Sequence, residues 1–211
     1  MAVCSLDHLV VTAPELSAGV EFIEDLFQVR MHPGGEHVRM GTHNCVLRIG
    51  PKIYLEVIAI NPDAPPVSRS RWFKLDQMSS YAEPRLATWI IRSTNIAAST
   101  QSISTFGPIE QMSRGMMEWK IAIPSDGSLL YSGVCPGIIQ WEKGGHPTDN
   151  MPASDVSLLH LKTFHPEAAS INRLLADTRF VPDVQIPSVV VSESRQLVAA
   201  LQTPRGIVEL R

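Results

Sequence analysis

The sequence is short of cysteine, of excess charge and of long apolar runs, and each shortage excludes a class of protein. Its three cysteines, Cys4, Cys45 and Cys135, are widely spaced and form no CxxC pair. This usage argues against a disulfide-stabilised secreted domain and favours reduced thiols in a cytoplasmic protein. Eighteen Lys and Arg residues against 21 Asp and Glu residues give a net charge of −3. Without a basic excess to neutralise phosphates, we do not expect the chain to bind nucleic acid.

Nothing in the sequence indicates a membrane protein or a disordered one. No apolar run approaches the roughly 18 residues that a membrane-spanning helix needs. The N-terminus, MAVCSLDH, also lacks the basic start and the apolar stretch of a signal peptide. Hydrophobic residues make up 44% of the 211-residue chain and charged residues 18%, a composition typical of folded proteins. We therefore expect a globular protein of one large domain or two small ones.

Two passages of the sequence resemble each other. The first reads LDHLVVTAPE at residues 6–15, and the second reads LLHLKTFHPE at residues 158–167. In both, an apolar run precedes Pro-Glu and then apolar residues at helical spacing. Proline and an acid both suit the first turn of a helix, so each passage predicts a strand followed by a helix.

Each of these passages continues to an apolar strand that contains a glutamate. Glu56 lies in IYLEVI, 48 residues after His8, and Glu209 lies in IVEL, 49 residues after His160. The interval leaves room for further strands in each copy. We predict them at residues 46–50 in the first copy and at 188–194 and 196–202 in the last. The repeated unit is therefore βαβββ.

A weaker copy lies between these two. Residues 86–92, LATWIIR, predict an opening strand, and Asn95 is placed to cap a following helix that Gly107 ends. Trp89 stands here where the outer copies have histidine, and Glu142 closes the copy. The other strands of this copy are predicted at residues 117–123, 129–133 and 136–142.

The three copies define the domain organisation that we predict. The fold class is α+β, built of repeated βαβββ modules. Residues 1–150 are predicted to form one domain of two modules, about 4–60 and 85–144. Residues 155–211 are predicted to form a third module. Modules this small do not bury a sufficient core alone, so the third is expected to pack into the same assembly.

A glutamate inside an apolar strand is costly to bury unless it is paired, protonated or bound to a metal. Strand alternation places Glu56 on one face with Tyr54, and it places His8 on one face with Leu6 and Val10. If the two strands are neighbours, His8 and Glu56 project from the same face. Imidazole and carboxylate ligands suit zinc, iron, manganese or nickel. The ordinary alternatives stay open: a hydrogen-bonded structural histidine and a solvated glutamate.

These motifs resemble the vicinal oxygen chelate superfamily, which includes glyoxalase I, bleomycin-binding proteins and extradiol dioxygenases. The resemblance rests on LDHLVV followed by a helix, and on the strand YLEV. A glyoxalase-like branch of that superfamily is a closer match, through GTHN at residues 41–44 and CVLRIGPKIYLEVIAINP after it. Trp89 and the stretch IIQWE, followed by His146-Pro147, are similar to that branch as well.

The resemblance implies a curved mixed sheet that encloses a cleft, with helices on the outside. It also implies that a divalent metal is held by ligands from the first and last strands of two paired modules. If consecutive modules pair, the set is His8, Glu56 and Glu142, with Trp89 at the remaining position. If the first module pairs with the last, the set is His8, Glu56, His160 and Glu209. Consecutive pairing is the arrangement that we favour.

The same resemblance implies how the cleft is used. Glu56 or His43 is expected to move a proton, and the substrate is expected to contact Trp89, Asn44, Tyr54 and Trp119. For Trp89 a place in the core is an equal alternative. His37 and His32 are interpreted as solvated loop residues, and His146 as part of a turn. Because neighbouring strand residues point to opposite faces, one of His43 and Asn44 is expected to be structural.

Two functions remain open from the sequence. The first is a metal-dependent lyase, isomerase or dioxygenase that acts on a small organic molecule in the cleft. The second is a metal-free protein that binds or sequesters such a molecule without catalysis. The resemblance also implies a homodimer, although a chain with three modules can complete the cleft alone.

Overall fold

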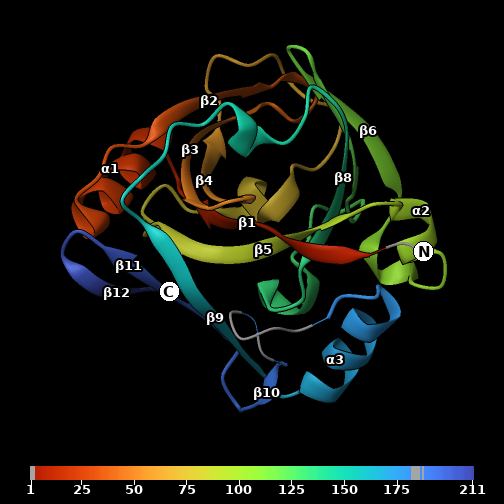
Figure 1. Cartoon of the computed structure of the whole chain (residues 1–211). Coiled ribbons are helices and arrows are strands. Elements are labelled where there is room, and N and C mark those ends of the chain that lie inside the picture. The colour runs from red at the N-terminus through yellow and green to blue at the C-terminus, as the bar shows by residue number, and fades with distance from the viewer. Residues whose placement is uncertain (1–2, 182–185, 187) are drawn as a thin grey trace.

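The computed structural model describes residues 3–181, 186 and 188–211. Figure 1 shows an eight-stranded sheet that curls into an almost closed ring, with a smaller four-stranded sheet beside it. The order of the large sheet is β2-β3-β4-β1-β5-β8-β7-β6. Helix α1 lies outside the ring (Figure 1). The predicted α+β class, with a curved mixed sheet and helices on the outside, is confirmed.

The first βαβββ unit contains one strand that the sequence analysis treated as a loop. Its elements are β1 (Cys4–Thr12), α1 (Leu16–Phe27), β2 (His32–His37), a 3-10 turn η1 (Val38–Met40), β3 (Thr42–Gly50) and β4 (Ile53–Ile60). Strand β2 is the edge strand HPGGEH, and its pairing with β3 shifts register between Pro33 and Gly35. A proline and two glycines are poor strand formers, which hid this edge strand from the sequence.

The second unit differs from its prediction in one strand. It consists of β5 (Arg85–Ser93), α2 (Ile96–Thr100), η3 (Ser104–Phe106), β6 (Ile109–Arg114), β7 (Met117–Ala122), η4 (Leu130–Gly133) and β8 (Gly137–Lys143). Asn95 caps α2 as predicted, because its side-chain oxygen accepts a hydrogen bond of 3.1 Å from the backbone N–H of Ala98. The strand predicted at 129–133 is wrong: this segment is a 3-10 turn in which Tyr131 and Ser132 have positive φ. The middle strand is β6 instead.

The two units join through their first strands. Strands β1 and β5 pair antiparallel, and β4 lies parallel to β1 on its other side. Consecutive modules therefore build the ring. At its far ends β2 approaches β6: a Cβ on Gly35 would lie 2.8 Å from Cδ of Arg114. Both halves of the concave face thus come from one chain.

The last part of the chain is not a true third copy. Its elements are β9 (Ser157–His165), α3 (Ala168–Asp177), β10 (Val190–Val191), β11 (Gln196–Thr203) and β12 (Gly206–Leu210), in the order β10-β9-β11-β12. Strand β9 pairs with β11, whereas in the first unit the opening strand pairs with the closing strand β4. Of the strand predicted at 188–194, only residues 190–191 pair as a strand.

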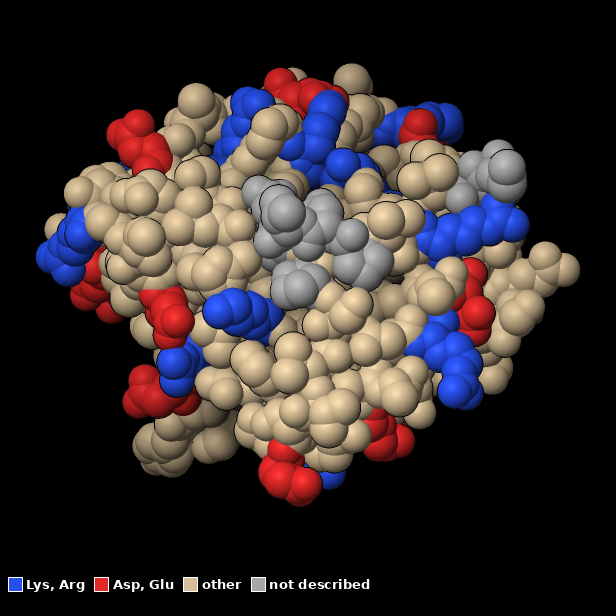
Figure 2. All heavy atoms as spheres, turned by 60° about the horizontal axis from the view of Figure 1, so that its bottom comes forward, with Lys and Arg blue, Asp and Glu red and all other residues tan. Residues whose placement is uncertain are grey.

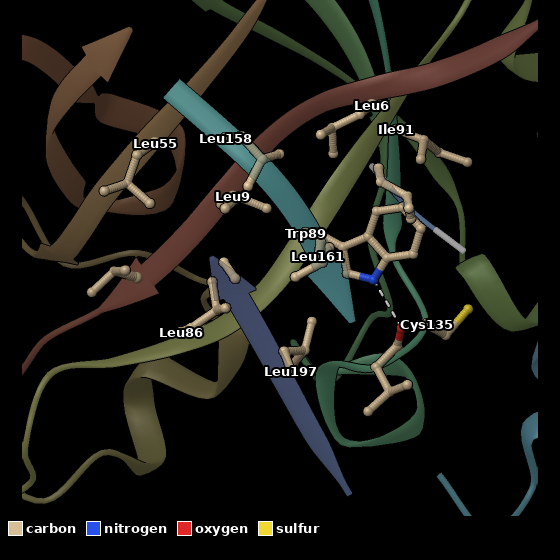
Figure 3. Packing of buried hydrophobic residues seen from close by; sticks show 14 of the residues in the cluster. Leu6, Leu9, Leu55, Leu86, Trp89, Ile91, Cys135, Leu158, Leu161 and Leu197 are labelled. Carbon is tan, nitrogen blue, oxygen red and sulfur yellow. Dashed lines mark hydrogen bonds between the residues drawn. The ribbon is translucent and has the colours of Figure 1, made fainter. Parts of the chain in front are cut away.

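The small sheet covers the outer face of β1 and β5. Leu158, Leu161 and Leu197 of the small sheet share one buried cluster with Leu9 and Trp89 of the ring (Figure 3). Trp89 is fully buried, and its indole N–H donates a hydrogen bond of 2.8 Å to the carbonyl of Val134. A separate apolar cluster lies within the ring, on the concave side. The two clusters hold the sheet between them, which fixes the geometry of its concave face.

Two further connecting elements complete the ring. Segment η2 (Trp72–Gln77) lies in the connector between the two units, and η5 (Pro147–Asp149) follows β8.

Figure 2 shows charges of both signs interspersed on the side of the small sheet, with uncharged surface between them. No helix among the described residues is long and apolar enough to cross a membrane.

Candidate functional site

The site begins with an irregularity in β1. Against β5, Leu6 pairs with Ile91 and His8 pairs with Ile90, so Asp7 is an extra residue in β1. Such a bulge turns a side chain away from regular alternation. It explains why Leu6 belongs to the outer cluster while His8 lines the concave cavity. The prediction that His8 shares a face with Leu6 is therefore wrong, while Val10 does lie on the concave side.

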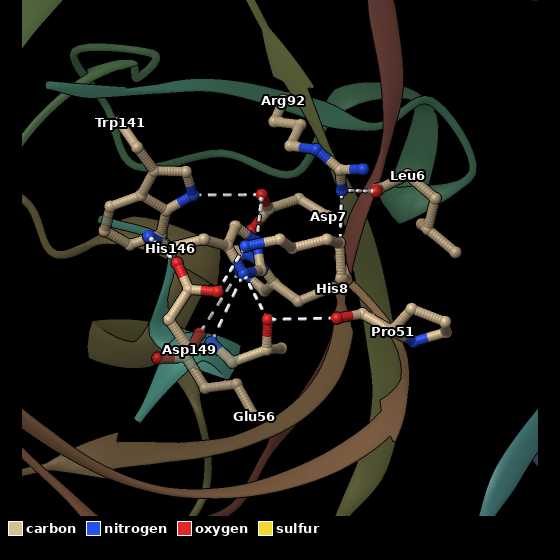
Figure 4. A network of polar contacts seen from close by, with 11 residues as sticks. Leu6, Asp7, His8, Pro51, Glu56, Arg92, Trp141, His146 and Asp149 are labelled. Atoms are coloured by element: carbon tan, nitrogen blue, oxygen red, sulfur yellow. Dashed lines mark hydrogen bonds and ion pairs between the residues drawn. The ribbon is translucent and has the colours of Figure 1, made fainter. Parts of the chain in front are cut away.

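Asp7 is completely buried and accepts hydrogen bonds from three side chains (Figure 4). Its Oδ1 lies 2.6 Å from Nδ1 of His8. Its Oδ2 lies 3.0 Å from the indole nitrogen of Trp141 and 3.1 Å from Nε2 of His146. Burial alone would raise the pKa of Asp7, but the hydrogen bonds from His146 and His8 hold it well below its usual range. Asp7 is thus an ionised carboxylate inside the protein.

The hydrogen bonds fix the protonation of both imidazoles. Nδ1 of His146 accepts the backbone N–H of Thr148 at 3.2 Å, so the proton of its ring lies on Nε2 and points to Asp7. This contact forms a capping box at η5, as the interpretation of His146 as turn chemistry predicts. His8 donates from Nδ1 to Asp7, because an ionised carboxylate only accepts. Nε2 of His8 is left to face the cavity.

Glu56 stands opposite that nitrogen. Its Oε2 lies 3.6 Å from Nε2 of His8, and its Oε1 accepts a hydrogen bond from the side-chain amide of Asn44. Tyr54 stacks on the His8 ring with 4.5 Å between the ring centroids. Burial, together with Asp7 and Glu56 nearby, raises the pKa of Tyr54 well above its usual value, so its hydroxyl stays protonated. Nε2 of His8 and Oε2 of Glu56 therefore face each other inside the cavity.

Arg114 completes the polar side of the cavity. Its Nη1 donates to Oδ1 of Asn44 at 3.1 Å and approaches Nε2 of His37 at 3.4 Å. Two glycines make room for this arrangement: a Cβ on Gly34 would lie 2.0 Å from Oδ1 of Asn44, and one on Gly35 would meet Arg114. The glycines of the edge strand β2 therefore admit both side chains to the cleft.

His37 is a buried member of the cleft and not the solvated loop residue that we predicted. Its Nδ1 lies 3.1 Å from the hydroxyl of Thr42, and its ring packs edge-on against Trp72 and Trp119. Burial and the charge of Arg114 lower the pKa of His37 to about 3. A neutral His37 accepts from Arg114 and thereby orients the guanidinium.

Aromatic and aliphatic side chains form the remaining wall. Trp72, Phe73, Trp119, Ile121, Ile139 and Trp141 line the cavity. The free volume between the lining residues is about 30 Å³, space for one or two water molecules. Organic ligands usually occupy several hundred Å³. The cavity is therefore smaller than such a ligand needs, and we call Trp72 and Phe73 of η2, which lie on one side of it, its cover.

The structure brings five of the predicted site residues to this cavity: His8, Glu56, Asn44, Tyr54 and Trp119. It places two others elsewhere. Trp89 lies in the outer core, because strand alternation turns it away from its neighbour Ile90 of β5, which belongs to the cluster on the concave side. His43 points away from the cavity into a groove beside Val20 of α1, since its neighbour Asn44 takes the concave side.

The other predicted metal ligands also lie apart from His8 and Glu56. Glu142 follows the cavity residue Trp141 in β8 and therefore points outward, where it pairs with Lys120 at 2.5 Å. His160 and Glu209 flank Ala200 in the small sheet, and Glu209 pairs with Arg211 on the surface. Neither predicted set of ligands is assembled.

The donor set does not fit a transition metal. Nε2 of His8 and Oε2 of Glu56 could both reach one ion, but catalytic sites use three protein ligands. Asp7 and His146 are nearby, yet their polar atoms are engaged with each other and with Trp141 and Thr148. Within the described ranges, no group of three His, Cys, Asp or Glu side chains is arranged to hold a metal ion.

Two paired βαβββ units around a buried acid–base cluster define the class of protein. Residues 6–178 match the family of glyoxalase-like domains, more than half of the chain. The chain therefore belongs to this glyoxalase-like family, within the vicinal oxygen chelate superfamily that its motifs resemble. No match was found among curated proteins.

Several solved structures are similar to this chain at low sequence identity. A hypothetical protein from Staphylococcus aureus is 14% identical with a TM-score of 0.55, and the match covers 98% of this chain and 84% of that one. Methylmalonyl-CoA epimerase from Streptomyces coelicolor, in complex with 2-nitronate-propionyl-CoA, is 12% identical with a TM-score of 0.44 over 67% and 96% of the chains. The Mycobacterium tuberculosis epimerase is 13% identical with a TM-score of 0.41 over 66% and 88%.

Sequence reasoning missed Asp7, Arg114 and Trp141 as members of the cluster, and it assigned His146 only to a turn. Asp7 was hidden by the bulge, since regular alternation turns it away from His8. Arg114 lies in β6, a strand that the sequence analysis did not predict. One signal was available: an aspartate directly before the strand histidine in an apolar run is costly to bury unless it has donors nearby.

Proposed function

We propose that this chain binds a small organic molecule in the concave cavity and moves a proton on it with His8. The observation that carries the proposal is the buried series of Asp7, His8 and Glu56. Asp7 holds Nδ1 of His8 at 2.6 Å, and Nε2 faces Glu56 at 3.6 Å. A carboxylate behind an imidazole fixes its tautomer and stabilises the imidazolium formed when the other nitrogen takes a proton.

The proposed reaction starts at a carbon next to a carbonyl group. The C–H bond breaks, its electron pair moves toward the carbonyl oxygen, and Nε2 of His8 takes the proton. Asp7 and Glu56 then stabilise the imidazolium from both sides. Return of a proton to the opposite face of the same carbon gives the epimer, and departure of a leaving group from the next carbon, with its bonding electron pair, gives the product of a lyase. The buried cavity keeps water from competing for the proton.

These groups support two of the three reaction classes that the family resemblance implies. Isomerase and lyase chemistry needs an acid and a base, which His8 and Glu56 provide. Dioxygenase chemistry needs a redox metal, for which these two side chains offer an incomplete ligand set. We therefore propose an isomerase or a lyase.

The second candidate function is binding without catalysis. It is favoured by the tryptophans around the cavity, because Trp72, Trp119 and Trp141 could hold a planar molecule by stacking alone. In that case the polar cluster would only orient the ligand. Catalysis requires the imidazole of His8, whereas binding alone does not.

Deuterium exchange separates the two functions. A panel of small 2-oxo and 3-oxo carboxylic acids is incubated in D2O with the wild type, with His8→Gln and with His160→Gln as the matched control in the small sheet. We expect the wild type and His160→Gln to speed exchange at a C–H position beside the carbonyl, and His8→Gln to lose at least a factor of about 100. Equal rates with wild type and His8→Gln would overturn the catalytic proposal, and binding without exchange would favour the second function.

We also propose a reducing compartment for this protein and a cavity that one chain completes. Cys4, Cys45 and Cys135 are all free thiols, two of them buried, which supports a reducing compartment such as the cytoplasm. Because both halves of the concave face come from one chain, the cavity needs no second copy to be complete. A homodimer would therefore add an interface without adding to the cavity.

A further inference from the structure

We infer that Arg114 is the residue that selects the ligand, and that the ligand carries a carboxylate group. This inference rests on the proposed function and names the class of molecule that the cavity accepts. The guanidinium of Arg114 has three contacts. Arg114 contacts the side-chain oxygen of Asn44, the ring nitrogen of His37 and, at 4.0 Å, the sulfur of Met117. All three are neutral.

Arg114 thus lacks the partner that a partly buried guanidinium normally has. Within the described part of the chain, no carboxylate lies within 4.0 Å of it, whereas the exposed Arg30 and Arg39 and the half-buried Arg71 each pair with an acid. A cation held away from water without a counterion is costly. A ligand anion in the cavity would supply that counterion.

The geometry suits a carboxylate. Arg114 uses Nη1 for both Asn44 and His37, and Nη2 has one weak contact with the sulfur of Met117, so the Nε–H and one N–H of Nη2 remain for a ligand. Two parallel hydrogen bonds from a guanidinium match the two oxygens of a carboxylate. The contacts of Nη1 with Asn44 and with the neutral ring of His37 restrain the guanidinium at the cavity.

The charge of the cavity favours a single negative charge on the ligand. Glu56 is linked to Arg114 through one amide, that of Asn44, so a second anionic group lies close to the proposed position. A phosphate dianion would be repelled by Glu56 more strongly than a carboxylate. The nearby rings of Trp72 and Trp119 would cover an apolar or unsaturated body, and His8 would reach the carbon beside it. The expected ligand is a small organic acid with one carboxylate.

Nuclear magnetic resonance of the arginine side chains tests this assignment directly. The Nε–H signal of Arg114 is identified by its loss in Arg114→Met, with Arg39→Met as the control on an exposed, paired arginine. Formate, acetate, benzoate and inorganic phosphate are titrated separately at constant ionic strength set with chloride. We expect saturable shifts of the Arg114 signal with the carboxylates, at least about tenfold tighter than with phosphate, and no response of the Arg39 signal.

Several outcomes would overturn the assignment. These are a response no larger than that to chloride, equal or tighter binding of phosphate, or carboxylate binding that survives in Arg114→Met. The variant His8→Gln keeps the two proposals apart. If the Arg114 signal responds to carboxylates in wild type and in His8→Gln, the assignment of Arg114 stands even when deuterium exchange fails. If deuterium exchange depends on His8 while the Arg114 signal does not respond, only the assignment of Arg114 is overturned.

Discussion

Nδ1 of His8 donates a hydrogen bond of 2.6 Å to the carboxylate of Asp7, the residue directly before it in the chain. Neighbours in a regular strand point to opposite faces, so this contact exists only because β1 bulges between Leu6 and His8. The bulge brings an ionised carboxylate behind an imidazole whose other nitrogen faces the cavity. The proposed chemistry depends on this relationship.

The first prediction concerns the carboxylate. Asp7→Asn keeps the shape of the side chain, but its amide group would face donors from His8, His146 and Trp141. We expect the free energy of unfolding to fall by about 3 kcal/mol, because buried hydrogen bonds to a charge are lost and a donor is left without an acceptor. Urea denaturation followed by circular dichroism measures this.

Asp63→Asn is the control for that measurement, since Asp63 is exposed and lies outside the cluster. It should change the free energy of unfolding by less than about 0.5 kcal/mol. A similarly small effect of Asp7→Asn would mean that the three donors do not depend on the carboxylate.

The second prediction is a pH dependence that comes from His37. Its pKa is about 3 in the folded protein and about 6.5 in the unfolded chain, so between these values the unfolded chain binds the extra proton. The stability from this residue is complete above pH 6.5 and is lost as the pH falls toward 3. The loss amounts to about 1.4 kcal/mol per pH unit between pH 6 and pH 4.

A comparison of wild type with His37→Gln isolates that contribution. Thermal and urea unfolding are measured from pH 7 to pH 4.5, and the variant is expected to be less stable at pH 7 but to lose less stability on acidification. Parallel curves for the two proteins would show that His37 is not buried in its neutral form.

The fold was predictable from local sequence patterns, whereas the site was predictable only in part. Alternation in IYLEVI placed Tyr54 and Glu56 together, and both line the cavity. The same rule failed at Asp7, because one extra residue in a strand leaves no mark in the hydrophobic pattern. The copy alignment assigned Trp89 to a ligand position, one residue away from Ile90 on the concave side. Spacing between copies cannot resolve a shift of one residue.

The third prediction concerns the cover of the cavity. Lys74 of η2 has φ of 57°, a left-handed conformation that favours glycine, and its side chain is exposed. Its backbone N–H donates to the carbonyl of Gly127 at 2.9 Å, a contact that glycine would keep. We expect Lys74→Gly to raise the free energy of unfolding by about 1 kcal/mol.

Gln77→Gly, at the end of the same turn, is the matched control. Gln77 has no positive φ, so glycine there should lower the free energy of unfolding by about 0.5–1 kcal/mol. If both variants lose stability equally, the left-handed turn beside Phe73 is not the resting conformation of the cover.

The fourth prediction concerns metal. Because His8 and Glu56 offer two ligands, protein purified without a chelator should contain far less than one equivalent of zinc, iron, manganese or nickel. Dialysis against a chelator should leave its melting temperature unchanged. A full equivalent of metal in the wild type that disappears in both His8→Ala and Glu56→Ala would contradict this reading of the site.

The central claim is that Nδ1 of His8 carries a proton held by Asp7 while Nε2 exchanges protons with the cavity. Nitrogen-15 resonance of the imidazole, recorded from pH 5 to pH 9 and assigned with His8→Gln, tests this without any ligand. We predict that Nδ1 carries a proton throughout this range. In Asp7→Asn the preference of the ring proton for Nδ1 of His8 should weaken. A neutral ring with its proton on Nε2 and a bare Nδ1 would contradict the account.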